Sequence, residues 1–449
     1  MRSTARTAIL SLAAALCISA PLFAQSDLDQ RINKEADSLL ATYKHLHENP
    51  ELSTQEKETS ALIAAELRKL GYEVTDHFGQ YDDPSLISYG VVAVLMNGPG
   101  PVVYVRTDMD ALPIVENTGL PYASHVKVKR AGGAEVGVMH ACGHDLHMTV
   151  FLGTARMLAR LKDRWSGTVV LIGQPAEETV GGAQAMLRAG LYTKFPKPDY
   201  VLALHDSAGI PAGTVSWHAG PLLAGADSVD ITVRGYGGHG AAPQVSKDPI
   251  VIASEIVVML QTVVSREMDP QLPTVVTVGS FHAGTKHNII PDEVKMQLTV
   301  RTYKKEVRDK ALAAIDRIAR GIAAAAGVPP ERAPVVTVRQ DEVCPAMYNN
   351  PELTKRLVAV WKKSLGDENV EIVDPTMGGE DFSEYSLPDH SIPAVNFHFG
   401  AVDPGKIADY KKAGKELPSL HSSKFAPVPE PTIRVGIIGM TTAVLDLMK

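Results

Sequence analysis

Hydrophobic residues in the first half of the chain form two kinds of segment that alternate with one another. Between Gln30 and Leu70 the apolar residues recur at helical spacing, and Asn49-Pro50 interrupts them, so two helices are predicted there. Further along, short apolar runs predict strands at residues 91–96, 102–105, 169–172 and 200–204, and helical spacing predicts helices at residues 148–161 and 183–189. This alternation indicates an α/β domain with a mostly parallel sheet covered on both faces.

The pattern changes near residue 222, where apolar and polar positions begin to alternate as they do in a half-exposed strand. The predicted strands are residues 227–234, 274–278, 294–302 and 335–338, and the predicted helices are residues 249–264 and 305–325. Their order, βαββαβ, is that of a ferredoxin-like domain.

Segments typical of the first domain then return towards the end of the chain. Residues 351–365 and 431–448 are predicted helices, and residues 394–397 are a predicted strand. Residues 401–424 are polar and predict a long loop, a feature that is often functional inside a compact domain. We therefore predict a catalytic domain in two parts, residues 27–221 and 339–449, with an inserted domain at residues 222–338.

Length and charge support this organisation and exclude one class of partner. The chain has 449 residues, which exceeds the size at which a single core is usual. The formal net charge is -7, and no basic run occurs, so nothing in the composition points to a nucleic-acid partner.

The first 24 residues resemble a secretory signal peptide. Arg2 and Arg6 precede an apolar stretch at residues 8–20, and small residues reach Ala24. We expect cleavage after Ala24, a periplasmic or secreted protein, and no stable membrane insertion afterwards; the alternative is an uncleaved membrane anchor. Export to an oxidising compartment would permit one disulfide between Cys142 and Cys344.

The densest chemical signal is the segment His140-Ala-Cys-Gly-His-Asp-Leu-His147. The thiolate of Cys142 and the imidazole of His144 are ligands that zinc and similar metals prefer. Gly143 between them permits a backbone tight enough for both side chains to face one ion. The alternative is a polar loop that caps the following helix.

Three further acidic or histidine pairs each follow a predicted strand. They are Asp108 and Asp110, Glu177 and Glu178, and His205 and Asp206. The carboxyl ends of strands are where α/β sheets place their sites. Adjacent carboxylates cannot both be buried readily without a cation, so one glutamate is a candidate metal ligand and the other a candidate general base. Taken singly, these pairs also fit an exposed helix start, an Asx turn or a structural histidine.

Together these motifs, in this order, resemble the aminoacylase and carboxypeptidase superfamily of dinuclear metallohydrolases. The greatest similarity is to the branch that holds hippurate hydrolase, indole-3-acetyl-amino-acid hydrolases and N-acyl-L-amino-acid amidohydrolases. The resemblance covers nearly all of the chain after the signal peptide. The motifs are Asp108-Met-Asp-Ala-Leu-Pro113, His140-Ala-Cys-Gly-His-Asp145, Gln174-Pro-Ala-Glu-Glu178, Gly238-His-Gly-Ala-Ala-Pro243, His287-Asn-Ile-Ile-Pro-Asp292, Gly378-Gly-Glu-Asp-Phe382 and Ser419-Leu-His421.

The resemblance implies two divalent metal ions, with zinc favoured and manganese, cobalt or nickel as alternatives. Glu177 would be the general base, and Asp110 would orient a ligand. Most branches of the superfamily have a ligand histidine where this chain has Asp108, so the role of Asp108 stays open. The implied metal ligands are Cys142, which would bridge the ions, His144, Glu178, His205 and His421.

The inserted domain also gains a role from the resemblance, as a lid and dimerisation domain. His239 would stabilise the oxyanion, reaching into the site of the neighbouring subunit of a homodimer. Asn288 and Arg301 would hold the substrate, and the turn at Gly378 and Gly379 would lie against it. The implied reaction is hydrolysis of N-acyl-L-amino acids; the alternatives are a carboxypeptidase or dipeptidase on the same centre, and a binding protein with an inactive centre.

Overall fold

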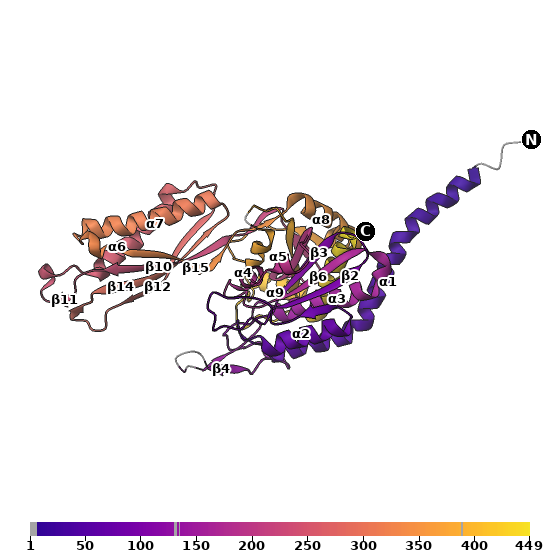
Figure 1. Ribbon diagram of the computed structural model, residues 1–449, viewed down its shortest axis with the longest axis horizontal. Coiled ribbons are helices and arrows are strands. Elements are labelled where there is room, and N and C mark those ends of the chain that lie inside the picture. Colours follow the sequence, from indigo (N-terminus) through magenta and orange to yellow (C-terminus); the bar gives the residue numbers. More distant parts are fainter. Residues whose placement is uncertain (1–6, 130–132, 134, 388) are drawn as a thin grey trace, which may run out of the picture.

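The computed structural model describes residues 7–129, 133, 135–387 and 389–449, with side chains from Asp27 onward. The predicted signal peptide, residues 1–24, lies outside the residues whose side chains are described. Figure 1 shows two bodies, a larger one that contains the carboxyl terminus and a smaller one at the other end of the molecule.

The larger body, the catalytic domain, is built on an eight-stranded mixed sheet. Its four central strands, β6, β3, β7 and β18, are mutually parallel, and antiparallel strands lie towards its edges. In spatial order the strands are β1 (Glu73–Thr75), β2 (Val91–Asn97), β6 (Gly167–Gln174), β3 (Val102–Asp108), β7 (Tyr200–Pro211), β18 (Ala394–Val402), β8 (Val215–Trp217) and β17 (Val370–Ile372). The carboxyl ends of the central strands therefore meet at one edge of the sheet.

Helices cover both faces of this sheet because its central strands are apolar on both sides. On β3, Val103 and Val105 pack into one core while Tyr104, which points to the opposite face, packs into another. The first core also contains residues of α1 (Thr7–Glu48), α2 (Lys57–Lys69), α3 (His144–Arg160), α8 (Pro351–Leu365) and α10 (Pro429–Leu447). The second contains residues of α4 (Gly182–Arg188), α5 (Leu191–Lys194) and the 3₁₀ segment Asp381–Ser386.

The smaller body, the lid domain, has the predicted βαββαβ order and a core of its own. Its antiparallel sheet runs β12–β14–β10–β15, and α6 and α7 share a core with one face of that sheet. The elements are β10 (Gly225–Arg234), α6 (Pro249–Thr262), β12 (Thr274–Ala283), β14 (Glu293–Thr302), α7 (Lys305–Ala325) and β15 (Val335–Cys344). A small two-stranded antiparallel sheet of β11 (Gly238–His239) and β13 (Ile289–Ile290) lies at the far end of this domain (Figure 1). The remaining short strands are β4 (Lys127–Lys129), β5 (Glu135–Gly137), β9 (Gly220–Leu223) and β16 (Met347–Asn349).

Two predicted details are wrong. The predicted loop at residues 401–424 contains a helix, α9 (Pro404–Lys412), which begins with the capping residue Asp403 and has no buried residues. Helix α3 begins at His144 rather than Met148, because Gly143 adopts a left-handed conformation that turns the chain directly into the helix. Cys142 and Cys344 are both free thiols, so the disulfide between them that the sequence would permit is not formed.

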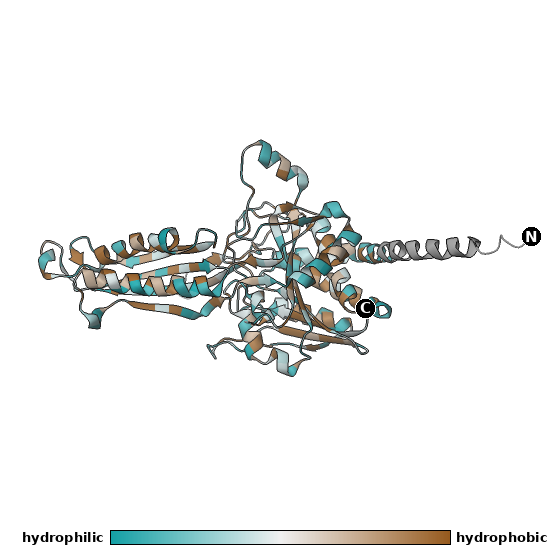
Figure 2. Cartoon of the chain, turned by 90° about the horizontal axis from the view of Figure 1, so that it is seen from above, coloured by the Kyte–Doolittle hydropathy of each residue, from teal (hydrophilic) through white to brown (hydrophobic). Residues whose placement is uncertain are grey.

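One helical segment in the described part of the chain, Pro249–Glu267, is long and apolar enough to cross a membrane by length and composition. This segment is α6 with the helical turn that follows it. Five of its residues are buried in the core of the lid domain, namely Ile252, Ala253, Ile256, Leu260 and Val263. Figure 2 shows hydrophobic and hydrophilic residues alternating along the helices of the smaller body. Packing in that core accounts for much of its apolar character.

A buried ion cluster joins α1 to the start of α3. His47 Nδ1 lies 2.6 Å from an oxygen of Asp145, and His47 Nε2 lies 3.1 Å from an oxygen of Glu116. Burial disfavours the imidazolium, but the hydrogen bonds with the two carboxylates outweigh burial and raise the pKa of His47 to about 10. The charged imidazolium is therefore the form that stabilises the fold.

We expect His47→Gln to lower the free energy of unfolding by about 3 kcal/mol at pH 6 and by less at pH 10. A folded-state pKa above the usual 6.5 contributes stability that is fully present below pH 6.5 and is lost as the pH rises through about 10. Thermal unfolding of the full chain across this range measures the difference, with the exposed His45→Gln as a matched control. A difference that does not change with pH would contradict the assignment.

Candidate metal centre

The segment of residues 140–147 places its ligand-type side chains at the carboxyl edge of the sheet. Gly143 has a φ of +76°, and a Cβ on it would come within 2.4 Å of the carboxylate of Asp206. Glycine is therefore required here both for the backbone conformation and for the close approach of Asp206. The turn leaves Cys142 at its tip and puts His144 in the first turn of α3.

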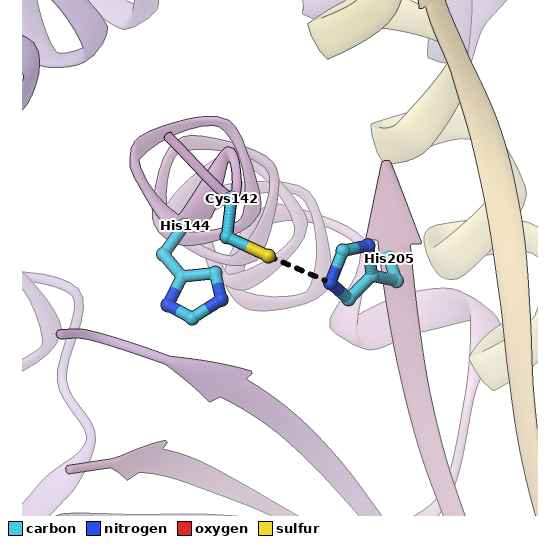
Figure 3. Close-up of side chains that lie close together, drawn as sticks. All are labelled: Cys142, His144 and His205. Carbon is cyan, nitrogen blue, oxygen red and sulfur yellow. Dashed lines mark hydrogen bonds between the residues drawn. The ribbon is translucent and has the colours of Figure 1, made fainter. Parts of the chain in front are cut away.

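Cys142 lies between two groups of histidine and carboxylate side chains. Its Sγ lies 3.6 Å from Nε2 of His205, which is on β7, and 3.2 Å from Nε2 of His421. Figure 3 shows Cys142 and His144 on one side of the site and His205 facing them from the neighbouring strand. Cys142, His144 and His205 form one set of ligand atoms within 4.8 Å of one another, and Cys142, Glu178 and His421 form another. The thiol is thus common to two possible metal positions.

His421 reaches this centre from the last part of the chain. Its Nε2 lies 3.5 Å from an oxygen of Glu178, and its side chain is 54% exposed, whereas the side chain of Glu178 is 8% exposed. Its backbone has a φ of +63°, which is uncommon for a residue other than glycine. Backbone strain of this kind often occurs at functional sites because the surrounding structure holds the residue in place.

Backbone carbonyls orient two of the histidines for metal binding. Nδ1 of His144 lies 2.8 Å from the carbonyl oxygen of Asp110, and Nδ1 of His205 lies 2.8 Å from that of Asp206. Donation to a carbonyl places the hydrogen on Nδ1 and leaves the lone pair of Nε2 free for a cation. This is the usual arrangement behind a metal-binding histidine.

Unpartnered atoms and charge show that a cation fits the centre. Among the described residues, Nε2 of His144 and Oε1 of Glu178 are buried without a hydrogen-bond partner. Burial is the main cause that raises the pKa of Glu178, to about 7, and that raises the pKa of the Cys142 thiol. A bound cation would stabilise the ionised forms of both groups, so the donor set suits divalent metals that accept sulfur, nitrogen and oxygen ligands.

Asp110 holds the loop that carries the two glutamates. Its two carboxylate oxygens accept hydrogen bonds of 3.0 Å from the backbone N–H groups of Glu177 and Glu178. Burial, followed by the negative charges of Glu380, Glu178 and other neighbours, raises the pKa of Glu177 well above its usual range. A carboxyl group with a raised pKa in a cleft is a candidate for proton transfer.

A fully buried arginine near the metal centre, Arg106, was not singled out in the sequence analysis. Arg106 donates to Asp108 over 2.7 Å, to Glu380 over 2.9 Å and to Asp381 over 3.1 Å. The other oxygen of Asp108 lies 2.7 Å from Nδ1 of His147. Asp108 therefore links Arg106 to His147 through its two carboxylate oxygens. The signal was an arginine inside an apolar strand, since a buried cation needs anionic partners.

The centre opens into a cleft of about 630 Å³ between the catalytic domain and the lid. Cys142, Glu177, Glu178, His205 and His421 line one side of it. Arg301 of β14 and the turn at Gly378 and Gly379 line it as well, and a Cβ on Gly379 would come within 2.8 Å of the Arg301 guanidinium. His398 of β18 also lines the cleft and was not singled out in the sequence.

The structure does not bring His239 and Asn288 to the centre of their own chain. His239 belongs to the two-stranded sheet of β11 and β13 at the far end of the lid, and Asn288 immediately precedes β13. There the N–H of Gly240 donates to the carbonyl oxygen of Asn288 over 2.9 Å. Figure 1 shows β11 at the end of the lid that is farthest from the catalytic sheet.

Comparison with known proteins agrees with this geometry. Residues 104–413 match the profile of Peptidase family M20/M25/M40. The chain belongs to this family. It is 36% identical over 413 residues to thermostable carboxypeptidase 2 of Saccharolobus solfataricus, covering 92% of this chain and 95% of the relative. It is also 40% identical over 342 residues to hippurate hydrolase of Campylobacter jejuni, covering 75% of this chain and 82% of that relative.

A solved member of the M20 family has the same architecture. The crystal structure of the Bacillus subtilis YXEP protein, described as a dinuclear metal-binding peptidase, superposes with a TM-score of 0.71 at 29% identity, covering 93% of this chain and 99% of that one. The present chain is therefore a metal-dependent hydrolase of amide bonds, with a catalytic α/β domain and a second, inserted domain.

Proposed function

We propose that this M20 hydrolase cleaves N-acyl-L-amino acids into a carboxylic acid and a free amino acid. One observation carries the proposal: four of the five candidate metal ligands, together with Glu177 and Arg301, line the same cleft. A cationic side chain in the same cleft as the metal centre suits a substrate that bears a carboxylate next to its amide bond. A cleft of about 630 Å³ has room for an acyl group as well as an amino acid.

We propose two divalent ions as the cofactor, with zinc as the favoured metal. The ligands would be Cys142, His144, Glu178, His205 and His421, with Cys142 shared between the ions. Thiolate and imidazole ligands suit zinc, although manganese, cobalt and nickel accept the same groups. Elemental analysis of the metal-loaded protein identifies the metal, and a content of one ion or fewer per chain would contradict the two-ion assignment.

Each residue of the cleft has a separate role in the proposed hydrolysis. When bound, the metal ions polarise the amide carbonyl and lower the pKa of a water molecule. Glu177 accepts a proton from this water and later donates a proton to the leaving amine. Arg301 holds the substrate's carboxylate, and the backbone of Gly378 and Gly379 lies beside it. His239 of a second subunit would donate a hydrogen bond to the developing oxyanion.

A panel of substrates tests this function. The metal-loaded enzyme is expected to hydrolyse hippurate and N-acetyl amino acids with a higher kcat/KM than dipeptides or longer peptides. The reverse order would favour the second candidate, a carboxypeptidase or dipeptidase, which the similarity to thermostable carboxypeptidase 2 supports. Substrate binding without turnover at full metal loading would overturn both.

We further propose that two chains form a homodimer through their lids. Helix α6 exposes Val251, Val258 and Met259, whose exposed fractions are 55%, 72% and 41%. Strand β12 is an edge of the lid sheet, and an uncovered edge can pair with a strand of another chain. A symmetric dimer would bury these apolar residues. It would also allow the small sheet of β11 and β13, with His239 and Asn288, to approach the partner's cleft.

Mixed dimers test the shared site. We expect His239→Ala and Glu177→Gln to be inactive separately, and an equal mixture refolded or co-expressed together to recover roughly a quarter of the wild-type activity. The recovery follows because half of the dimers would be hybrids, each with one site that has both intact residues. A mixture that stays inactive, although hybrids are detected by mass, would contradict the contribution of His239 from the second chain.

We also propose that the protein is exported and is soluble after cleavage behind Ala24. The proposal rests on the basic, apolar and small-residue pattern of residues 1–24. Sequencing the amino terminus of the protein from fractionated cells tests it. An intact terminus in the membrane fraction would favour the uncleaved anchor.

A further inference from the structure

Glu56 occupies the capping position of α2 but does not cap that helix. Its side chain makes no hydrogen bond to the first turn of α2. Glu51 caps the helix instead, accepting hydrogen bonds from the N–H groups of Glu58 over 3.2 Å and Thr59 over 2.8 Å. The carboxyl group of Glu56 is therefore available for another role.

The side chain of Glu56 points into the protein towards the loop that carries Glu177 and Glu178. One of its oxygens accepts hydrogen bonds from the N–H of Thr54 over 2.9 Å and from the N–H of Ala176 over 2.8 Å. The residue is 0% exposed. Burying a carboxyl group costs free energy, so a residue kept in this position has contacts that compensate for the cost.

Two buried carboxyl groups thus hold three consecutive backbone N–H groups. Glu56 accepts from Ala176, and Asp110 accepts from Glu177 and Glu178. The three N–H groups together fix the direction in which the two glutamate side chains leave the backbone. If Asp110 were the only acceptor, the N–H of Ala176 would have no hydrogen-bond partner.

The backbone at Ala176 needs such support. Its φ is +53°, a left-handed conformation that costs roughly 1–2 kcal/mol for a residue with a Cβ. The carbonyl oxygen of Ala176 accepts hydrogen bonds from the N–H groups of Gly181 and Gly182, but its N–H is held by Glu56. Without the bond to Glu56, this side of the residue would lose its restraint, and a more favourable conformation would compete with the left-handed one. The peptide that follows would then rotate and displace Glu177.

We propose that Glu56 is a positioning residue that holds Ala176 in its left-handed conformation and so aims Glu177 and Glu178 at the metal centre. The inference rests on the proposed roles of these two glutamates. It assigns a function in the active site to a residue that contacts neither the cleft nor the ligand side chains.

The test compares Glu56→Ala, Glu56→Gln and the control Glu51→Ala in the metal-loaded full chain. Glu56→Ala is expected to lower kcat by about 10- to 100-fold, the range for small displacements of catalytic groups, with KM within about twofold. Glu56→Gln keeps an acceptor oxygen and is expected to retain most of the activity. Glu51→Ala removes the cap of the same helix and is expected to lower the unfolding temperature while leaving kcat unchanged.

Binding of Co²⁺ to the metal-free protein supplies a readout that does not depend on turnover. Glu56→Ala is expected to weaken Co²⁺ binding by about tenfold, because Glu178 is displaced. Glu56→Gln and Glu51→Ala are expected to bind Co²⁺ as tightly as the wild-type protein. If the wild-type protein proves inactive on N-acyl amino acids, the proposed substrate fails while this measurement still decides the role of Glu56.

A second pair of variants keeps the proposal testable if Glu56→Ala does not fold. Glu56→Asp shortens the side chain and is expected to lose the bond to Ala176. Adding Ala176→Gly is expected to restore part of the lost kcat, because glycine adopts a positive φ without the Cβ penalty. The proposal is wrong if Glu56→Ala, or Glu56→Asp in its place, matches Glu51→Ala in both kcat and Co²⁺ affinity.

Discussion

Replacing Glu177 by Gln is expected to lower kcat for N-acyl amino acids by about 10³-fold while the metal content stays unchanged. The amide has almost the shape of the carboxylate but cannot accept a proton. Glu177 is 8% exposed, and its N–H is held by Asp110, so the substitution should leave the loop in place. Steady-state kinetics together with metal analysis of the same preparation measure both expectations.

The same variant is also expected to be at least as stable as the wild-type protein when metal is absent. The pKa of Glu177 is raised by burial and by nearby carboxylates, so its ionised form is unfavourable in the folded protein. Removing the charge relieves this repulsion. Glu371→Gln, a change at an exposed position on β17, serves as the control for both measurements. Turnover near the wild-type rate would rule out Glu177 as the base.

Replacing Cys142 by Ala is expected to reduce the bound metal from two ions to one or fewer per chain. Its Sγ is the atom common to the two sets of ligands, so both metal positions lose a donor. Removing only an outer partner of a metal ligand typically costs 10- to 100-fold, so we expect kcat to fall by more than about 100-fold here.

Cys344→Ala is the matched control, since Cys344 is the other free, buried cysteine in the described chain. It should bind the full complement of metal. Elemental analysis and activity at saturating Zn²⁺ separate weak binding from loss of catalysis. Two ions bound to Cys142→Ala with normal turnover would show that the thiol is not a bridging ligand.

The sequence predicted the architecture of this protein because hydrophobic periodicity is a local property. Helices α7 and α8 begin and end at the predicted residues. The predicted βαββαβ order and the central parallel strands are confirmed, because alternation and apolar runs record which faces are buried. Helix α9 was missed because it buries nothing, so no apolar pattern marks it.

The metal centre was predicted in part from local motifs and in part from family resemblance. Cys142 and His144 lie in one segment rich in metal-ligand residues. His421 lies 277 positions after His144, and no pattern of neighbouring residues marks it as a ligand. Buried contacts between remote segments, such as the ion cluster of Arg106 and the bonds of Glu56, have no periodicity that a sequence pattern could show.

By itself, the sequence determined the chemistry and the order of the elements. The residue types that can bind a metal and move a proton, the strand ends that carry them and the inserted lid are all properties of neighbouring positions along the chain. Only the tertiary structure decided which of these residues meet. It placed Cys142 between His205 and His421, joined Asp110 and Glu56 to one loop, and left His239 and Asn288 at the far end of the lid. The physical reason is that parallel strands from distant segments end at one edge of the sheet, so long-range packing rather than local preference sets the distances that catalysis requires.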